Sequence, residues 1–141
     1  MREIKFGGKQ IDNGEWVYGD FVHHDGITDI HFQTGDGEAH SISVDPETVG
    51  QYTGLSDKNG KEIYEGDIVK THYANTNNLN MIEEVVFWNG RFMAKSLGSR
   101  TNLWDGIKRV SFDKTVYMNS IEVIGNIHDN PELMEGGNGH S

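Results

Sequence analysis

The stretch that decides the fold is residues 16–32, WVYGDFVHHDGITDIHF. Asp25-Gly26, near its centre, supplies the positive φ angles that a two-residue hairpin turn needs. Counting outward from this turn pairs Phe21 with Ile30 and Asp20 with His31, and successive side chains alternate between two faces. One face is predicted to be buried and the other to meet water. The predicted apolar face holds Val17, Phe21, Ile30 and Phe32, and the polar face holds Asp20, His24, Asp29 and His31 beside Trp16 and Tyr18.

A second hairpin is predicted around Asn89-Gly90. Its register sets Glu84 opposite Lys95, and such an opposite-charge pair favours the pairing. It also sets Trp88 opposite Arg91, which allows a cation–π contact. The face predicted to be buried holds Val85, Phe87, Phe92 and Ala94.

Turn dipeptides of the Asn-Gly and Asp-Gly type recur six times between residues 13 and 106, and no helical periodicity of useful length is present. This pattern predicts an all-β, mainly antiparallel protein. At Asn59-Gly60 a two-residue turn would oppose like charges, as in the pair Lys58 and Lys61, so a wider loop is expected there.

Two sub-regions are predicted, an N-terminal β-rich part at 1–50 and a C-terminal part at 51–133, followed by a disordered tail at 134–141. The Asn-rich segment 74–80 is expected to be a flexible loop. The expected strands lie near residues 3–11, 15–23, 27–33 and 40–44 in the first part, and near 61–64, 67–73, 82–88, 91–96 and 121–127 in the second.

The composition is acidic and lacks cysteine. In 141 residues there are 12 Lys and Arg against 22 Asp and Glu, a formal charge of −10. A chain of this size buries roughly 68% of its unfolded surface, so a hydrophobic core is expected. The lack of cysteine excludes disulfides, thiolate nucleophiles and cysteine-ligated metals. No apolar run approaches the roughly 18 residues of a membrane span, so a soluble cytoplasmic protein with no membrane partner is expected.

Several blocks of sequence, at both ends and in the middle of the chain, occur in a specific order and spacing. They are EIKF at 3–6, NGEWVYGD at 13–20, QYTGL at 51–55, DKNGKEIYEGDIV at 57–69, IEVIGNI at 121–127 and NPEL at 130–133. Together these blocks resemble the YopX family of phage and prophage proteins. The resemblance implies a β-rich N-terminal part, a C-terminal part similar to an SH3-type barrel, and a setting in the cytoplasm of a bacterial host cell. It implies no activity.

Histidines and aspartates gather in the first hairpin, and imidazole with carboxylate suits zinc or another transition metal. The alternative is a solvated polar face, where such side chains belong without any ligand. We favour the solvated face, and no cofactor is predicted. The candidate metal ligands on the polar face are Asp20, His24, Asp29 and His31.

No catalytic residue is predicted. The chain contains no nucleophile elbow, phosphate-binding loop, HExxH zinc motif or dinucleotide fingerprint. Glu83 and Glu84 have the chemistry of an acid–base pair, but neighbours on a strand point to opposite faces and cannot flank one bond. A protein that is not an enzyme is therefore expected.

Charge is divided unevenly along the chain. Residues 11–67 hold 13 acidic and 2 basic side chains, a net −11, whereas residues 91–114 hold 6 basic and 2 acidic ones, a net +4. The basic stretch, with aromatic side chains such as Phe92 for stacking, is a candidate nucleic-acid surface. The alternative, which we favour, is that its aromatics form core and its charges neutralise the acidic part. The candidate nucleic-acid residues are Arg91, Lys95, Arg100, Trp104, Lys108 and Arg109.

The favoured hypothesis is a phage or prophage accessory protein without an active site, which engages an unidentified protein partner through its acidic part. A homo-oligomer is one form that this hypothesis allows. Two alternatives stay open: nucleic-acid binding by residues 91–114, and a metal-dependent activity at the first hairpin.

Overall fold

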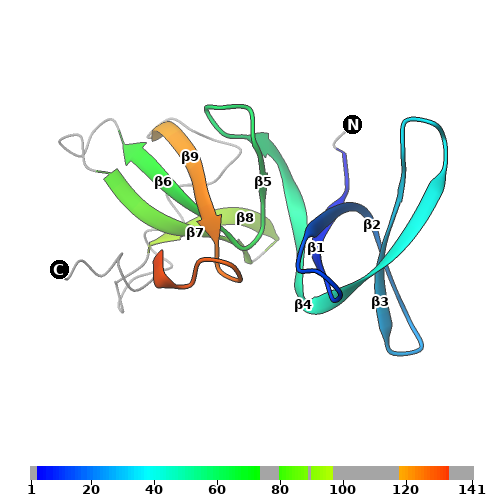
Figure 1. Ribbon diagram of the computed structural model, residues 1–141. Helices are drawn as coiled ribbons and strands as arrows, with labels where there is room; N and C mark the ends of the chain where they lie inside the picture. The colour runs from blue at the N-terminus through cyan, green and yellow to red at the C-terminus, as the bar shows by residue number, and fades with distance from the viewer. Residues whose placement is uncertain (1–2, 74–79, 89, 97–117, 134–141) are drawn as a thin grey trace. The chain divides into compact units, whose positions relative to one another are not determined.

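The computed structural model describes residues 3–73, 80–88, 90–96 and 118–133, and within them the chain is built mainly of β-strands (Figure 1). Two compact units are present, Met1–Gly54 and Leu55–Ser141. The prediction of an all-β, mainly antiparallel fold is confirmed. The predicted tail at 134–141 and the predicted loop at 74–80, except for Asn80, lie outside the described residues.

The first unit is a closed ring of four strands. β1 (Phe6–Gln10) pairs with β2 (Trp16–His24) on one side and with β4 (Ala39–Ser56) on the other. β3 (Ile27–Gln33) also lies between β2 and β4. Every strand of the ring therefore has a neighbour on each side, which is how a small barrel satisfies its backbone groups.

The predicted register of the first hairpin is confirmed. Asp20 pairs with His31, and the register continues to the turn. Both turn residues have positive φ angles, 50° at Asp25 and 76° at Gly26, as a two-residue hairpin turn requires. The turn dipeptide therefore sets which side chains share a face.

Burial on the predicted apolar face is uneven. Ile30 is fully buried, and Val17 and Phe32 are half-buried. The prediction that Phe21 is buried is wrong, because it is 43% exposed. Its ring packs against that of Phe6, with the centroids 5.4 Å apart, but a unit of four strands has little further surface to cover it.

β4 is much longer than the strand expected at residues 40–44, and that prediction ended the strand too early. β3 is the partner of residues 39–43 of β4, and β1 takes over as the partner of residues 44–51. The second half of β4 is thus paired with a strand more than thirty residues earlier in the chain. Local patterning does not show such a pairing.

A bulge interrupts the second half of β4. Between the pairs Gly7–Gly50 and Lys9–Asp45, four residues of β4 face the single residue Gly8. Pro46 lies in this bulge, where a missing N–H costs no ladder hydrogen bond.

Thr48 supplies the hydrogen bonds that the bulge removes from the ladder. Its hydroxyl oxygen accepts the backbone N–H of Lys9 at 2.9 Å, and the hydroxyl donates to the carbonyl of Asp45 at 2.6 Å. Thr48 is buried, so without these bonds both backbone groups would carry a desolvation cost.

Two glycines let the strands of the ring approach closely. A Cβ atom on Gly19 would lie 2.2 Å from the carbonyl oxygen of His31, and one on Gly8 would lie 2.9 Å from the side chain of Val44. The contact at Gly19 is with backbone, which cannot move without disturbing the β3 ladder. Only glycine fits at that position.

The second unit contains β5 (Glu62–Tyr64) and a four-stranded antiparallel sheet in the order β8-β7-β6-β9. These four strands are β6 (Asp67–Tyr73), β7 (Asn80–Trp88), β8 (Arg91–Ser96) and β9 (Met118–Asn126). The core comprises Ile63, Val69, Val85 and Ala94, with Met81, Ile121 and Val123 packed against it. The SH3-type barrel stays a prediction.

The register predicted for the second hairpin is confirmed, with Glu84 opposite Lys95. Three members of the predicted buried face, Val85, Phe92 and Ala94, are buried. The prediction is wrong for Phe87, which is 49% exposed although its ring meets that of Phe92 edge-on at 4.8 Å. Phe87 lies next to the last residue of β7.

A wider loop at Asn59-Gly60 is confirmed, since five residues separate the end of β4 from the start of β5. The buried carboxylate of Asp57 organises this loop by accepting the backbone N–H groups of Asn59 at 2.8 Å and Lys61 at 2.9 Å. It also accepts the N–H of Val123 in β9 at 2.9 Å. Burial alone would raise the pKa of Asp57, but these three bonds outweigh it and lower that pKa.

Asp67 is a half-buried carboxylate at the start of β6. Its carboxylate accepts the backbone N–H of Tyr64 at 2.8 Å. Desolvation by burial is the largest effect and raises the pKa of Asp67 to about 6, although the hydrogen bond and the charge of Lys61 oppose the rise. The second unit thus carries a carboxylate whose charge costs stability at neutral pH.

We expect Gly19→Ala to destabilise the protein by about 2 kcal/mol or more, because the new methyl group overlaps backbone. The measurement is denaturant unfolding followed by circular dichroism. Gly35→Ala is the matched control, since a Cβ atom there has nothing within 4 Å and the variant should unfold like the wild type. Equal stability of the two variants would contradict the close approach of β2 and β3.

We expect Asp67→Asn to be about 1–3 kcal/mol more stable than the wild type at pH 7.5, because the asparagine keeps an acceptor for the Tyr64 N–H and carries no charge. The folded pKa of Asp67 lies above its unfolded value, so its destabilising effect is complete above the folded pKa and fades as the pH falls. The difference in unfolding free energy should therefore shrink toward pH 5. Asp12→Asn, an exposed control, should show no such trend.

Candidate functional site

The candidate site is the polar face formed by β2, β3 and the first half of β4. β4 brings Ser43 opposite Asp29 and Ser41 opposite His31. The two serine hydroxyls donate to the carboxylate of Asp29, at 3.2 Å from Ser41 and 3.0 Å from Ser43. The Nε2 atom of His31 lies 3.9 Å from the same carboxylate. Asp29 is thus the centre of a small polar cluster.

An open pocket of about 500 Å³ lies beside the cluster, and residues from both faces of the β3–β4 pair line it. Its lining includes one acidic residue, Asp20, and no lysine or arginine. The lining residues are Asp20, His31, Phe32, Gln33, Ala39, His40 and Ser41.

The two histidines of the pocket share an unusual feature. The Nε2 atoms of His31 and His40 are shielded from solvent, and neither has a hydrogen-bond partner among the described residues. The carboxylate nearest to His40 is that of Glu38, at 3.9 Å. The ring of His40 also stacks on that of Phe32, with the centroids 5.1 Å apart and the planes inclined by 17°. Two imidazole nitrogens are therefore enclosed without a hydrogen bond from the described residues.

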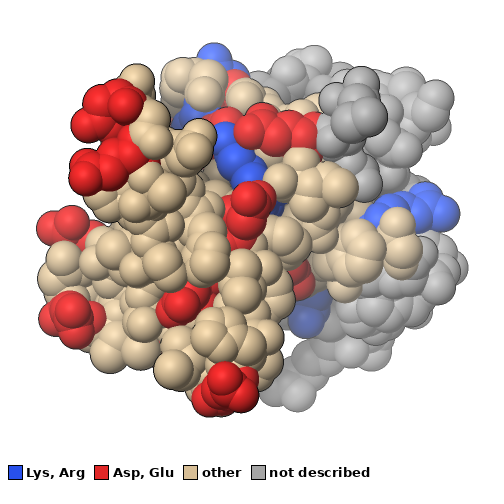
Figure 2. Space-filling model, turned by 90° about the vertical axis from the view of Figure 1, so that its right-hand side faces the viewer, with Lys and Arg blue, Asp and Glu red and all other residues tan. Residues whose placement is uncertain are grey.

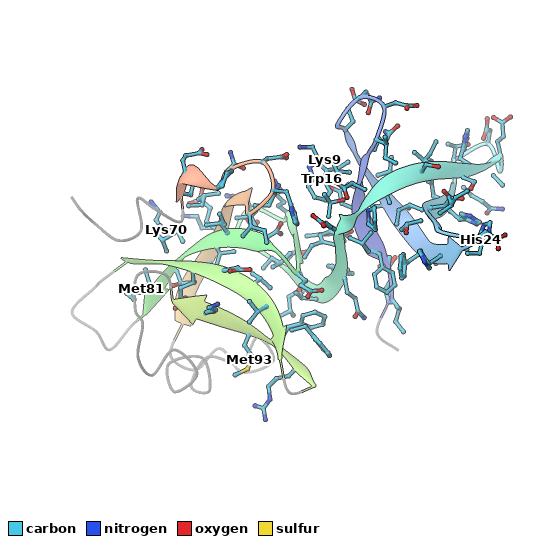
Figure 3. The ribbon with its side chains drawn as sticks, turned by 90° about the horizontal axis from the view of Figure 1, so that it is seen from below. Lys9, Trp16, His24, Lys70, Met81 and Met93 are labelled. Carbon is cyan, nitrogen blue, oxygen red and sulfur yellow. The ribbon has the colours of Figure 1, made fainter. Side chains whose placement is uncertain are left out.

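The four predicted metal ligands share one face but are spread along it. His24 and Asp20 are four residues apart on β2, about 13 Å along the strand, and His24 contacts Asp25 at 3.6 Å near the turn. Figure 3 shows His24 at the far end of this hairpin from Lys9 and Trp16. Among the described residues, no group of three or more His, Asp or Glu side chains is arranged to hold a metal ion.

Serine, aspartate and histidine occur together here, but their order of contact differs from that of a nucleophilic triad. In a triad the histidine lies between the other two and takes the serine proton. Here Asp29 lies between Ser41 and His31, so the serine hydroxyl donates to the carboxylate. The cluster fixes side-chain positions and supplies no base for Ser41.

The two adjacent glutamates of β7 are also separated. Glu83 is buried, and its carboxylate accepts a hydrogen bond from the hydroxyl of Thr71 at 2.8 Å. Glu84 faces Lys95 across the strand pair. Burial raises the pKa of Glu84, and the charge of Lys95 opposes that rise.

Gln33, His40, Ser41 and Ser43 belong to the site but were not predicted. They were missed because β3 was paired only with β2. The alternation of polar Ser41 and Ser43 with apolar Ile42 and Val44, soon after β3, was the signal that a third strand continues this face.

Only two of the candidate nucleic-acid residues are described. Arg91 is exposed, and Lys95 is half-buried opposite Glu84. Phe92, considered for base stacking, is buried in the core. The other candidates, Arg100, Trp104, Lys108 and Arg109, lie outside the described residues.

Because the predicted metal ligands are spread out, we expect Zn²⁺, Ni²⁺ and Mn²⁺ to leave the thermal unfolding midpoint unchanged. Specific binding at a hundredfold excess over the Kd would add about 2.7 kcal/mol of stability and raise the midpoint clearly. A rise that disappears in His31→Gln but persists in His128→Gln would establish a metal site on this face instead.

Comparison with known proteins bears on the fold and the family. Among curated proteins no match is found. A solved structure, protein EF1440 from Enterococcus faecalis, is similar with a TM-score of 0.54 and 24% identity, over 95% of this chain and 99% of that one. At this identity the likeness concerns the fold alone. No helix among the described residues is long and apolar enough to cross a membrane.

The family comparison covers almost the whole sequence. The model of the YopX protein family matches residues 5–135. The chain therefore belongs to the YopX family.

Proposed function

We propose that this protein is a non-enzymatic interaction module that binds a basic surface of a protein partner through its first unit. The observation that carries the proposal is the imbalance of charge in residues 3–54, which hold ten acidic and two basic side chains. All the acidic residues except Asp29 are exposed, whereas Lys5 and Lys9 are half-buried. In the view of Figure 2, acidic groups are spread over the surface and basic ones are few.

Four of these carboxylates form no hydrogen bond or ion pair with the rest of the described chain: Asp12, Glu15, Asp20 and Glu47. Their charge is not used to hold the fold together. Unpaired charge of one sign steers a partner of the opposite sign and speeds its association.

Large apolar side chains are exposed on the same unit. Protein interfaces combine a few apolar or aromatic contacts with a polar rim, so this mixture favours a protein partner. These side chains are Ile4, Ile11, Tyr18, Phe21 and Ile27.

A second copy of the chain is a poor occupant of this surface. A symmetric contact would set the same acidic patch against itself, and like charges brought together oppose association. The proposed partner is therefore a different, basic protein. We place the module, as a phage or prophage accessory protein, in the cytoplasm of a bacterial host.

The test is affinity capture of host proteins by the full chain, followed by mass spectrometry. We expect recovery of one or a few basic proteins. The double variant Asp12→Asn with Glu15→Gln should reduce the recovery several-fold, because charge steers the contact. Salt at 0.5 M should do the same, because it shortens the electrostatic screening length to about 4 Å. The matched control is Glu65→Gln with Glu132→Gln, which removes two exposed charges from the second unit and should leave recovery unchanged.

Two outcomes would contradict the proposal. Equal losses in the two double variants would show that the first unit is not the binding surface. Loss of all recovered protein after nuclease treatment would show that nucleic acid bridges the complex, which would favour the basic stretch 91–114 as the functional element.

A further inference from the structure

We propose that Asp25 is a site of spontaneous aspartyl isomerisation, in which the main chain comes to run through the side-chain carboxyl group of Asp25 instead of its α-carboxyl group. The site is the Asp25-Gly26 turn that joins β2 to β3. The modification goes beyond the proposed function and needs no reactant other than water. Glycine is the residue that lets a neighbouring group approach the backbone most closely, so an Asp-Gly sequence favours the reaction.

The reaction begins with attack by the backbone nitrogen of Gly26 on the Cγ atom of Asp25. A bond forms between these atoms, and the amide proton leaves with the hydroxyl group of the protonated carboxyl as water, which produces a succinimide ring. Water then adds to one of the ring carbonyls and breaks the bond of that carbonyl to nitrogen. Opening at the side-chain carbonyl restores aspartate, and opening at the α-carbonyl leaves isoaspartate.

The nitrogen that must attack is unbonded in this turn. The N–H of Gly26 has no hydrogen-bond partner among the described residues. Gly26 has a φ angle of 76°, and a Cβ atom placed on it would meet nothing within 4 Å, so the residue lies in open space. Loss of the amide proton and rotation of the nitrogen toward Cγ therefore break no hydrogen bond of the described chain.

The carboxyl group that is attacked is equally accessible. The side chain of Asp25 is 93% exposed. Its carboxylate lies 3.6 Å from the Nδ1 atom of His24, which is longer than a hydrogen bond. Isomerisation at Asp25 therefore meets little beyond the chemical barrier of the Asp-Gly sequence itself.

The Asp36-Gly37 turn between β3 and β4 has the same two residues in a different hydrogen-bonded state. The N–H of Gly37 donates to the carbonyl of Thr34 at 2.8 Å. The carboxylate of Asp36 accepts hydrogen bonds from the hydroxyl of Thr34 and from the N–H of Glu38, and these bonds lower its pKa. Because the ring forms from a free nitrogen and a protonated carboxyl, both effects oppose it. Asp36 is thus an internal control with the same local sequence.

The Asn-Gly turns at 13–14 and 59–60 resemble this control. The N–H of Gly14 donates to the carbonyl of Gln10 at 3.1 Å, and that of Gly60 donates to the carbonyl of Asp57 at 3.0 Å. Among the Asn-Gly and Asp-Gly pairs that the structure describes in full, Asp25-Gly26 alone leaves the glycine N–H without a partner.

Isoaspartate at position 25 would act on the turn that contains it. It adds one carbon atom to the backbone between β2 and β3, and a two-residue turn has no spare length to absorb it. The pair of His24 with Ile27, which closes the hairpin, should therefore weaken. Amide hydrogen exchange at these two residues should be faster in the modified protein.

The test is incubation of the full-length folded protein at pH 6 and 37 °C. A peptide digest is then resolved by chromatography, since aspartyl and isoaspartyl peptides have equal masses. We expect isoaspartate to accumulate at Asp25 about tenfold faster than at Asp36, because the bonds at Asp36 must break before the ring can form. In concentrated urea the two sites should react at similar rates, since only the local sequence then acts.

A matched pair of variants makes the same comparison through mass. Asp25→Asn and Asp36→Asn each create an Asn-Gly pair, which suits a turn. Deamidation of asparagine passes through the same ring, releases ammonia and raises the mass of the protein. Asp25→Asn should deamidate about tenfold faster than Asp36→Asn when both are folded, as circular dichroism can verify.

Equal rates at Asp25 and Asp36 in the folded protein would overturn the inference, and so would faster deamidation of Asp36→Asn than of Asp25→Asn. A rate ratio in urea as large as that in the folded protein would also overturn it, because the difference would then come from sequence and not from structure. Unchanged amide exchange at His24 and Ile27 in the modified protein would contradict the effect on the turn. The proposed function is tested separately by partner capture.

Discussion

The first unit depends on the close approach of β2 and β3 at Gly19, where no atom larger than hydrogen fits between the backbone of β2 and the carbonyl of His31. This contact lets four strands close into a ring in which each pairs on both sides. Closure has a second effect, since it brings β4 beside β3 and lays Ser41 and Ser43 on the face already lined by Asp29 and His31. The pocket is therefore a product of the same tight geometry that builds the ring.

In the second unit a carboxylate, and not a glycine, holds together segments that are distant in the sequence. Asp57 takes three backbone N–H groups, two in its own loop and one in β9, although Val123 is 66 positions away in the sequence. A buried charge is tolerated here because each bond favours the ionised form, which is why the pKa of Asp57 falls while that of Asp67, which accepts the single N–H of Tyr64, rises. Desolvation outweighs the opposing hydrogen bond at Asp67, whereas the three hydrogen bonds outweigh desolvation at Asp57.

The sequence predicts those parts of the structure that depend on interactions between residues close together in the chain. Both hairpin registers were correct because a turn dipeptide acts over a few residues and every pair follows from it. The second half of β4 was missed because its partner, β1, is distant in sequence and its pattern is broken by the bulge at Pro46. Alternation assigned Phe21 and Phe87 to the correct faces, but it does not reveal whether other elements cover them. The pocket depends on the β3–β4 pairing, which was not predicted. Of its lining residues, only Asp20 and His31 were therefore among the predicted site residues.

The carboxylates of the first unit fall into two groups, those that hold local structure and those that form no hydrogen bond or ion pair with the described chain. Some carboxylates hold local structure: Asp36 accepts a hydrogen bond from the hydroxyl of Thr34 and another from the N–H of Glu38, which lower its pKa, and Asp45 accepts the N–H of Glu47. A turn-rich chain needs such residues whatever its function. The surplus is the four carboxylates that form no hydrogen bond or ion pair with the described chain, Asp12, Glu15, Asp20 and Glu47. Asp20 is one of the four, and it is the one that lines the pocket. Recognition is therefore better sought in this unused charge than in the net charge of the whole protein.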